Sequence, residues 1–461
     1  MNIQVPKTAF NVVQKLLTDS QIVCNKIKKD KLLYIINVLF THGFFNNDEE
    51  SNGNVALSST KLKELLGSNY THHLRFLLEN EIIYLQRNYL KGSSCNQYAI
   101  APALIDEPIW HTMTDFTFSK KIRKQRKIKE KSKNEYPYLV KWFDGLKMNI
   151  PLAKNLFTAK QNELKIKMQR KEQINSCDSL HKESSKINYL AYIINSYEKK
   201  DFYFFVDSSG KRFHTLLTST NKELRQCLTY NGQRLVSIDL KNSQPYLLLV
   251  LANPAFLNSD LFLFISRGIY RNNKRILSIM LNKSAEMQNS KGFQRYKKLT
   301  TSGRLYESFL TTDEHSGKQL NDSKNRRDDI KKDVLIAFYS KQGTRSGGVK
   351  KIFRRKFPQV YQFINLVKKD NYKALALLLQ RIESHIMLDH VCARITSEKP
   401  DLPIFTIHDS VVTTEGNQEY VKQVIADEMF RFVGEFPMLS IEHWGDPVAD
   451  LSKELVPIYL E

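Results

Sequence analysis

Two short apolar segments of this sequence each carry an aspartate that could bind a metal ion. The first spans 235–239 and ends at Asp239, and the second spans 404–412 and is interrupted by Asp409. Apolar runs rich in β-branched residues are typical of buried strands. Two carboxylates that meet at a strand end and a hairpin tip can hold two divalent ions about 4 Å apart, as in-line phosphoryl transfer requires. The sequence therefore predicts a paired-carboxylate site on a small sheet.

Three polar residues precede Asp239 in an order that resembles a known superfamily. Arg212, Asn221 and Arg225 stand before the strand that ends at Asp239. This stretch resembles the family A DNA polymerases and the related phage-type single-subunit RNA polymerases. In those enzymes a Gly-Arg element, an Asn-containing turn and an Arg precede the first metal-binding Asp. The resemblance implies that Asp239 binds metal and that Arg212, Asn221 and Arg225 contact primer-template or incoming phosphate.

A second resemblance lies in a predicted helix between the two aspartates. Arg327, Lys331 and Tyr339 match the spacing of the superfamily's fingers helix. Residues 327 and 331 share one face of a helix. An arginine fork and a lysine point charge suit phosphate oxygens, so the resemblance implies that both bind the triphosphate and that Tyr339 lies near the base and sugar. A plain amphipathic helix is the alternative, and Lys332 competes with Lys331 for the inward position.

The third resemblance is His-Asp-Ser at 408–410, which the phage-type RNA polymerases share, whereas family A DNA polymerases have His-Asp-Glu. It implies that Asp409 is the second metal ligand and that His408 contacts the primer end. Gln380, in an apolar segment before the last strand pair, resembles a palm residue that faces the template. For Gln380 an ordinary surface role is the alternative.

The chain also departs from the superfamily. Gln244 stands five residues after Asp239, where DNA polymerases carry a Glu that blocks the ribose 2′-hydroxyl. Ser340 follows Tyr339, where many relatives have Gly. By this resemblance, Gln244, His-Asp-Ser and the fingers tyrosine Tyr339 favour ribonucleotides. The resemblance covers roughly 205–450, and no carboxylate set for a proofreading exonuclease is recognised, so a compact, divergent member is implied.

Charge and composition indicate a polyanionic partner. The chain has 461 residues, 41% of them apolar, and a net charge of +22. A large positive excess over a folded chain favours nucleic acid, with solubility charge as the alternative. Residues 119–133 include nine Lys or Arg and one Glu, which indicates either a phosphate-binding tether or a solvated helix. Five scattered cysteines are typical of reduced thiols. Since no run of 18 apolar residues and no signal-peptide pattern occurs, we expect a cytoplasmic monomer with no membrane partner.

The first hundred residues predict a separate winged-helix-like unit. Three helices are expected, followed by two strands, at 31–40, 61–66, 71–79, 82–86 and 97–100. Ser58 or Ser59 can cap the second helix and Gly67 can end it. The third helix could enter a major groove, although such units also bind proteins.

The predicted fold is α+β, a right-hand polymerase with palm, fingers and helical thumb behind the winged-helix-like domain. The expected parts are a winged-helix-like domain (1–105), a basic linker (106–135), a helical thumb-like region (136–204), a first palm part (205–254), fingers (255–375) and a second palm part (376–461).

The predicted activity is template-directed nucleotidyl transfer, with two Mg²⁺ ions, or Mn²⁺ in their place, bound by Asp239 and Asp409. Lys331 is the third catalytic residue. The expected partners are a DNA or RNA template-primer and nucleoside triphosphates, in the setting of a virus, plasmid or other mobile element. The alternatives are a replication initiator or regulator with an inactive polymerase-like part, and a template-independent nucleotidyltransferase. The sequence leaves open the product, the primer requirement and whether the N-terminal domain reads a specific sequence.

Overall fold

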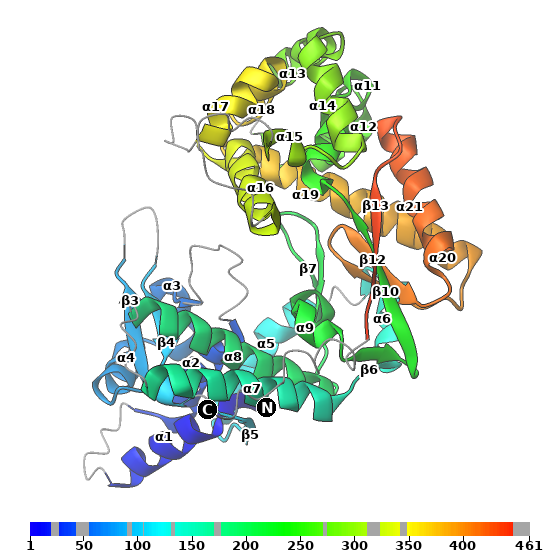
Figure 1. Cartoon of the computed structure of the whole chain (residues 1–461). Helices are drawn as coiled ribbons and strands as arrows, with labels where there is room; N and C mark the ends of the chain where they lie inside the picture. Colours follow the sequence, from blue (N-terminus) through cyan, green and yellow to red (C-terminus); the bar gives the residue numbers. More distant parts are fainter. Residues whose placement is uncertain are drawn as a thin grey trace, which may run out of the picture.

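The protein is described here by a computed structural model of residues 1–19, 27–42, 55–89, 95–104, 106–130, 134–169, 177–270, 274–310, 323–341 and 348–445. Helices and antiparallel strands alternate along these ranges, as expected for a mixed helix and sheet protein (Figure 1). None of the helices described is both long and apolar enough to cross a membrane.

The N-terminal elements form two small sheets packed among helices. The helices are α1 (Lys7–Asp19), α2 (Lys29–His42), α3 (Ser59–Leu66) and α4 (Tyr70–Glu79). The strands are β1 (Asn2–Pro6), β2 (Val55–Ala56), β3 (Ile83–Arg87), β4 (Gln97–Ile100) and β5 (Pro108–Thr112). β1 pairs with β5, and a second sheet has the order β2-β4-β3. The three helices and two strands predicted between 31 and 100 are thus present.

The ends of α3 and the face of α4 follow from single side chains. Ser58 caps α3 by accepting a hydrogen bond from the Lys61 backbone N–H at 3.4 Å, and Gly67 ends it with a φ of 84°. On α4, His72 and Arg75 are exposed. His73 is fully buried, accepts from the Lys28 backbone N–H and bonds the Asn69 carbonyl, so it belongs to the core.

Two long helices pack on this N-terminal part. The connecting elements are α5 (Phe116–Glu130), α6 (Pro137–Val140), β6 (Leu146–Met148), α7 (Ile150–Gln169) and α8 (Cys177–Glu198). α7 lies beside α8, and α8 contacts α2 and β4 (Figure 1). Asn195 and Ser196 of α8 hydrogen-bond the buried side chain of Gln4. The helices predicted in 136–204 are therefore present and share a core with the N-terminal strands.

A six-stranded antiparallel sheet positions the two aspartates. It consists of β6, β9 (Leu228–Tyr230), β10 (Gln233–Leu240), β11 (Ile404–Ile407), β12 (Ser410–Thr414) and β13 (Leu439–His443). β10 lies between β12 on one side and β9 and β13 on the other. Helix α21 (Gln418–Val433) packs on β10 and β12. The hairpin β7 (Phe204–Val206) and β8 (Phe213–Thr215) precedes this sheet with α9 (Lys222–Arg225).

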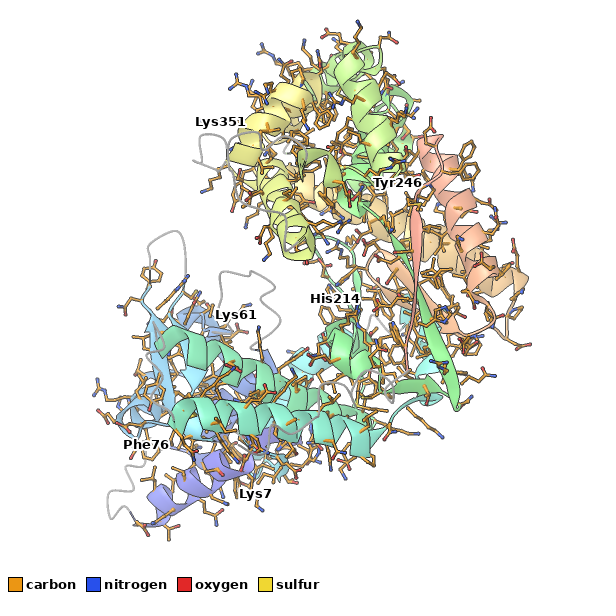
Figure 2. The ribbon with its side chains drawn as sticks, in the orientation of Figure 1. Lys7, Lys61, Phe76, His214, Tyr246 and Lys351 are labelled. Atoms are coloured by element: carbon orange, nitrogen blue, oxygen red, sulfur yellow. The ribbon has the colours of Figure 1, made fainter. Side chains whose placement is uncertain are left out.

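A helical insertion separates β10 from β11. It starts with α10 (Ser243–Leu251), whose Tyr246 is fully buried (Figure 2). The other helices are α11 (Pro254–Leu257), α12 (Asp260–Ile265), α13 (Lys274–Gln288), α14 (Lys291–Thr301), α15 (Glu307–Leu310), α16 (Ser323–Tyr339), α17 (Gly348–Lys356), α18 (Pro358–Val367), α19 (Ala374–Ser384) and α20 (Ala393–Glu398). Aromatic rings around the buried Phe353, including Tyr296 and Phe357, form its core. The described part of 255–375 is thus helical, as the sequence predicts.

Candidate active site

Asp239 and Asp409 lie on neighbouring strands of the six-stranded sheet. Asp239 is near the end of β10 and pairs in register with Ser410 of β12, so Asp409, which precedes Ser410, is next to it. Burial and then the charge of Asp409 raise the pKa of Asp239 to about 7. Burial also raises the pKa of Asp409, against a hydrogen bond from Ser243. Two half-buried carboxylates that lie next to each other strongly favour the binding of a cation.

A tight turn presents Asp409. Ile407 and Ser410 close the β11–β12 hairpin, leaving His408 and Asp409 as its two-residue loop. His408 has a left-handed φ of 54°, an uncommon conformation for a side-chain-bearing residue. Burial, followed by the charges of Arg212 and His214, lowers the pKa of His408 to about 3. His408 is therefore a neutral imidazole at physiological pH.

Helix α16 carries two neighbouring lysines, and the charge of one of them acts on both aspartates. The charge of Lys331 lowers the pKa of both Asp239 and Asp409. Lys332 instead approaches Asp329 of the same helix, with 3.9 Å between Nζ and Oδ1. These electrostatic contributions favour Lys331 over Lys332 as the lysine that acts on the aspartates.

Arg327, one turn before Lys331, is engaged elsewhere on the helical insertion. Its Nε donates to Glu307 Oε1 at 2.6 Å, and its guanidinium lies 5.6 Å from the ring of Tyr306. About a third of each of the two ion-paired side chains is exposed. A phosphate would therefore have to replace Glu307 or bind beside it.

A buried glutamate that the sequence did not point to organises the other predicted residues. Glu383 of α19 has 1% of its surface exposed. It accepts from Arg212 Nε at 2.8 Å and from Gln244 Nε2 at 2.6 Å. Gln244 Oε1 in turn accepts from the Tyr339 hydroxyl at 2.8 Å. Burial raises the pKa of Glu383 to about 7, although the Arg212 charge opposes this shift.

The pattern of α19 contains a signal for this glutamate. Its neighbours on the same helical face, Leu375, Leu379 and Ile382, are buried. An acid at a core position of an apolar helix requires a partner, since an unpaired buried charge is costly. That partner, Arg212, is 171 residues away in the chain, so spacing alone could not identify it.

The remaining predicted residues lie around this centre with structural partners of their own. Arg225 Nε donates to the Thr220 carbonyl at 2.8 Å, and its charge lowers the pKa of Asp239. Asn221 caps α9 by accepting from the Leu224 backbone N–H at 3.0 Å. Gln380 packs against the turn at Gly210, where an added Cβ would come 2.5 Å from Gln380 Oε1.

The oxygen donors fit a hard divalent ion that keeps part of its water shell. Asp239 and Asp409 supply carboxylates, and Glu442 of β13, which pairs in register with Ser237, raises the pKa of Asp239 by its charge. Glu442 is itself held by Lys222, with Nζ 2.6 Å from Oε1. The residues that the structure describes contain no group of three or more His, Cys, Asp or Glu placed to hold a metal. Two carboxylates with retained water suit Mg²⁺, which is bound in proteins by few protein ligands.

Comparisons with known proteins give a distant structural likeness. No protein-family model matches the sequence, and no curated protein matches it at a significant level. Among solved structures, the chain is similar to the POL domain of Pol1 from M. smegmatis, solved as a complex with DNA primer-template and dNTP. The match covers 71% of this chain and 72% of that one, at 11% identity and a TM-score of 0.44. A match this distant assigns neither a family nor an activity to the chain.

Proposed function

We propose that the protein is a template-directed nucleic-acid polymerase, which transfers nucleotides from nucleoside triphosphates to a 3′-hydroxyl. The observation that carries this proposal is the pair Asp239 and Asp409 next to each other on neighbouring strands, and the charge of Lys331, which lowers the pKa of both, supports it. Carboxylates opposite a cationic helix provide the opposed charges that a metal-bound triphosphate requires.

Asp239 and Asp409 would hold two Mg²⁺ ions, or Mn²⁺ in their place. When bound, the ions lower the pKa of the attacking hydroxyl and neutralise charge on the triphosphate. Lys331 would offset charge on the leaving pyrophosphate, and Arg327 would bind phosphate once it releases Glu307. The neutral His408 would contact the primer end without adding charge.

Under this proposal the rest of the chain handles nucleic acid and nucleotide. The six-stranded sheet would be the palm, α11–α18 the fingers, and α7 and α8 the thumb. The unit of α2–α4 and β2–β4 would be a winged helix that presents His72 and Arg75 of α4. Helix α5 carries Lys120, Arg123 and Lys124, which are exposed and would contact phosphates regardless of sequence.

Primer extension tests the proposal. Primed and unprimed DNA and RNA templates would be supplied with Mg²⁺ and with dNTPs or NTPs separately. Wild type would be compared with Asp239→Asn and Asp409→Asn, and Asp401→Asn, an exposed acid just before β11, is the matched control.

Templated extension that both site variants lose and the control retains would support the polymerase. Extension that ignores template sequence would indicate a template-independent nucleotidyltransferase instead. No incorporation, with nucleic-acid binding intact, would favour an initiator or regulator.

A further inference from the structure

The helix that carries Glu383 changes its winding just after that residue. α19 continues into a π-helix (His385–Cys392) before α20 begins. In an α-helix, residues five apart point about 140° away from each other. A π-helix closes i to i+5 contacts and is often found at functional sites. His385 and His390 are five residues apart and are thereby brought to one face.

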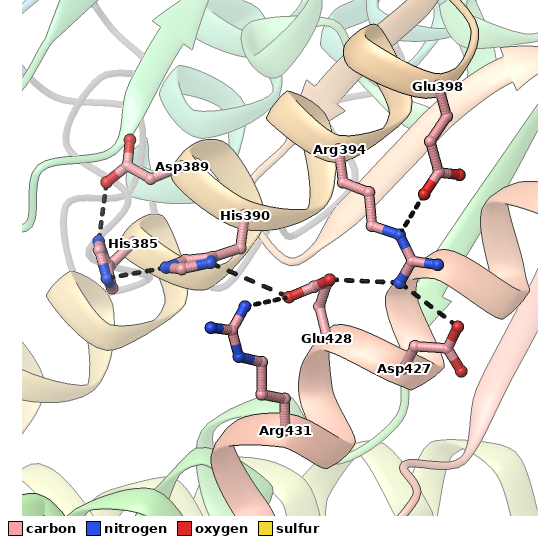
Figure 3. Close-up of polar contacts among 8 residues, drawn as sticks. All are labelled: His385, Asp389, His390, Arg394, Glu398, Asp427, Glu428 and Arg431. Atoms are coloured by element: carbon pink, nitrogen blue, oxygen red, sulfur yellow. Dashed lines mark hydrogen bonds and ion pairs between the residues drawn. The ribbon is translucent and has the colours of Figure 1, made fainter.

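The two imidazoles face each other through the same ring nitrogen (Figure 3). His385 Nε2 and His390 Nε2 are 3.1 Å apart, and the ring centroids are separated by 4.7 Å. Phe432 of α21 packs against both rings, with centroids at 6.1 and 4.9 Å. The rings are about a fifth and a quarter exposed, so water and small ions can reach them.

Each imidazole has a carboxylate near its Nδ1 atom, on the side away from the other ring. His385 Nδ1 bonds Asp389 Oδ2 at 2.8 Å, and Asp389 Oδ1 accepts from the Tyr136 hydroxyl at 3.1 Å. His390 Nδ1 lies 3.9 Å from Glu428 Oε2. Carboxylates that accept the outer N–H of a histidine orient the ring and raise its basicity as a metal ligand.

Glu428 is kept in place by arginines. Arg394 approaches its Oε1 at 3.2 Å, and Arg431 approaches its Oε2 at 3.7 Å (Figure 3). The Oε2 atom is buried and has no hydrogen-bond partner within the described part of the chain. It is therefore available to accept an N–H from His390 Nδ1.

The proton positions follow from these contacts. His385 donates its Nδ1–H to Asp389, so its Nε2 carries a lone pair, and His390 must donate its own proton between the two Nε2 atoms. If the His390 proton moves from Nε2 to Nδ1, towards Glu428, two lone pairs converge on one point. No net proton is gained or lost.

We propose that His385 and His390 bind one transition-metal ion of the Zn²⁺ type through their Nε2 atoms, with Asp389 and Glu428 holding the outer N–H groups. Two imidazoles bound to one tetrahedral ion at about 2.0–2.1 Å place their nitrogens roughly 3.3 Å apart, close to the spacing found here. Imidazole favours Zn²⁺, Cu²⁺ and Ni²⁺ over Mg²⁺. Since the described residues add no third His, Cys, Asp or Glu, water completes the coordination. This site is distinct from the carboxylate pair and does not depend on the proposed polymerase activity.

Titration of the chelator-treated full chain with Zn²⁺, followed by calorimetry, tests the site. We expect His385→Gln and His390→Gln to lower the affinity at least 100-fold. Asp389→Asn should lower it 10- to 100-fold, as loss of an outer carboxylate does. His443→Gln is the matched control, because this histidine also pairs with an acid, Glu415 at 3.1 Å, but has no such partner imidazole.

Cu²⁺ in place of Zn²⁺ gives a second readout that does not depend on activity. Its electron paramagnetic resonance spectrum should show two equivalent nitrogen ligands in wild type, and at most one in each histidine variant. Unchanged Zn²⁺ binding in folded His385→Gln and His390→Gln proteins would overturn the proposal and assign the ion to another group, such as the cysteines. Displacement of Zn²⁺ by millimolar Mg²⁺ would overturn it as well. Thermal unfolding of each variant confirms that it is folded.

Discussion

The Tyr339 hydroxyl donates to Gln244 Oε1 at 2.8 Å, which joins α16 to the first turn of α10 across 95 residues of sequence. Gln244 passes the connection to Glu383, which also accepts from Arg212. Four side chains, from three helices and the connection between β7 and β8, thus form one chain of hydrogen bonds beside Asp409. Because each end of the Gln244 amide has a fixed partner, its oxygen must face Tyr339 and its nitrogen must face Glu383.

Tyr339→Phe tests whether this amide contributes to sugar choice. The change removes the donor to Gln244 Oε1, and a net hydrogen bond of about 1 kcal/mol corresponds to roughly a fivefold change in an equilibrium. Under the proposed function we expect the ratio of kcat/KM for NTPs to that for dNTPs to shift by about this factor. The control is Tyr372→Phe, an exposed tyrosine. An unchanged ratio in Tyr339→Phe would show that this hydrogen bond does not contribute to the choice between NTPs and dNTPs.

Glu383→Ala should be among the most destabilising single changes in the chain. It leaves the Arg212 guanidinium and the Gln244 amide without their buried acceptor, and breaking a buried ion pair costs about 3–5 kcal/mol. The free energy of unfolding, from urea titration, measures this cost.

Glu398→Ala is the matched control for Glu383→Ala. Glu398 also pairs with an arginine, Arg394 at 2.6 Å, but on the surface, where such pairs contribute little to stability. Equal losses in the two variants would contradict the central position assigned to Glu383.

The residues that could be located from the sequence are those whose structural role depends on neighbouring residues of the same segment. Ser58 begins α3 and Gly67 ends it. Both could be located because a helix cap interacts only with the adjacent turn of backbone. The strand ending at Asp239 and the hairpin at Asp409 follow from short β-branched runs. In these cases neighbours in sequence supply the physical cause.

Features that depend on distant partners were not predictable in the same way. His73 is a polar residue on the helix that is expected to enter a major groove. It is buried, however, because the Lys28 backbone lies against it. β6 belongs to the central sheet only because β9 pairs with it. The facing imidazoles of His385 and His390 depend on a π-helix, whereas an α-helix over the same segment would place them on different faces.

Lys331→Ala and Lys332→Ala form a matched pair, since both side chains are exposed on α16, the charge of Lys331 lowers the pKa of both aspartates, and Lys332 approaches Asp329. Loss of a positioned charge at a reacting phosphate lowers kcat by about 10²–10³-fold. We expect that loss for Lys331→Ala and less than about a twofold change for Lys332→Ala, measured by single-nucleotide incorporation. Equal effects would mean that the cations act through general charge alone.

Lys368 should give the protein an alkaline pH dependence of stability. This lysine is 4% exposed, and its Nζ donates to the Ser340 carbonyl at 3.0 Å, at the end of α16. Burial, followed by the charge of Lys350, lowers its pKa from 10.5 to about 8. Between pH 8 and 10.5 the unfolded chain therefore binds more protons at this residue than the native chain, so the free energy of unfolding rises with pH.

Lys368→Met should remove this contribution, because methionine fills the site without a titrating group. The increase in unfolding free energy from pH 8 to 10.5 should be roughly 3 kcal/mol smaller than in wild type. Lys369→Met is the control, since Lys369 is the exposed neighbour and its loss leaves the buried amine in place. Urea titrations at pH 7.5, 9 and 10.5 measure the difference. Parallel pH profiles for wild type and Lys368→Met would show that the buried amine keeps its proton throughout, held by the carbonyls at the end of α16.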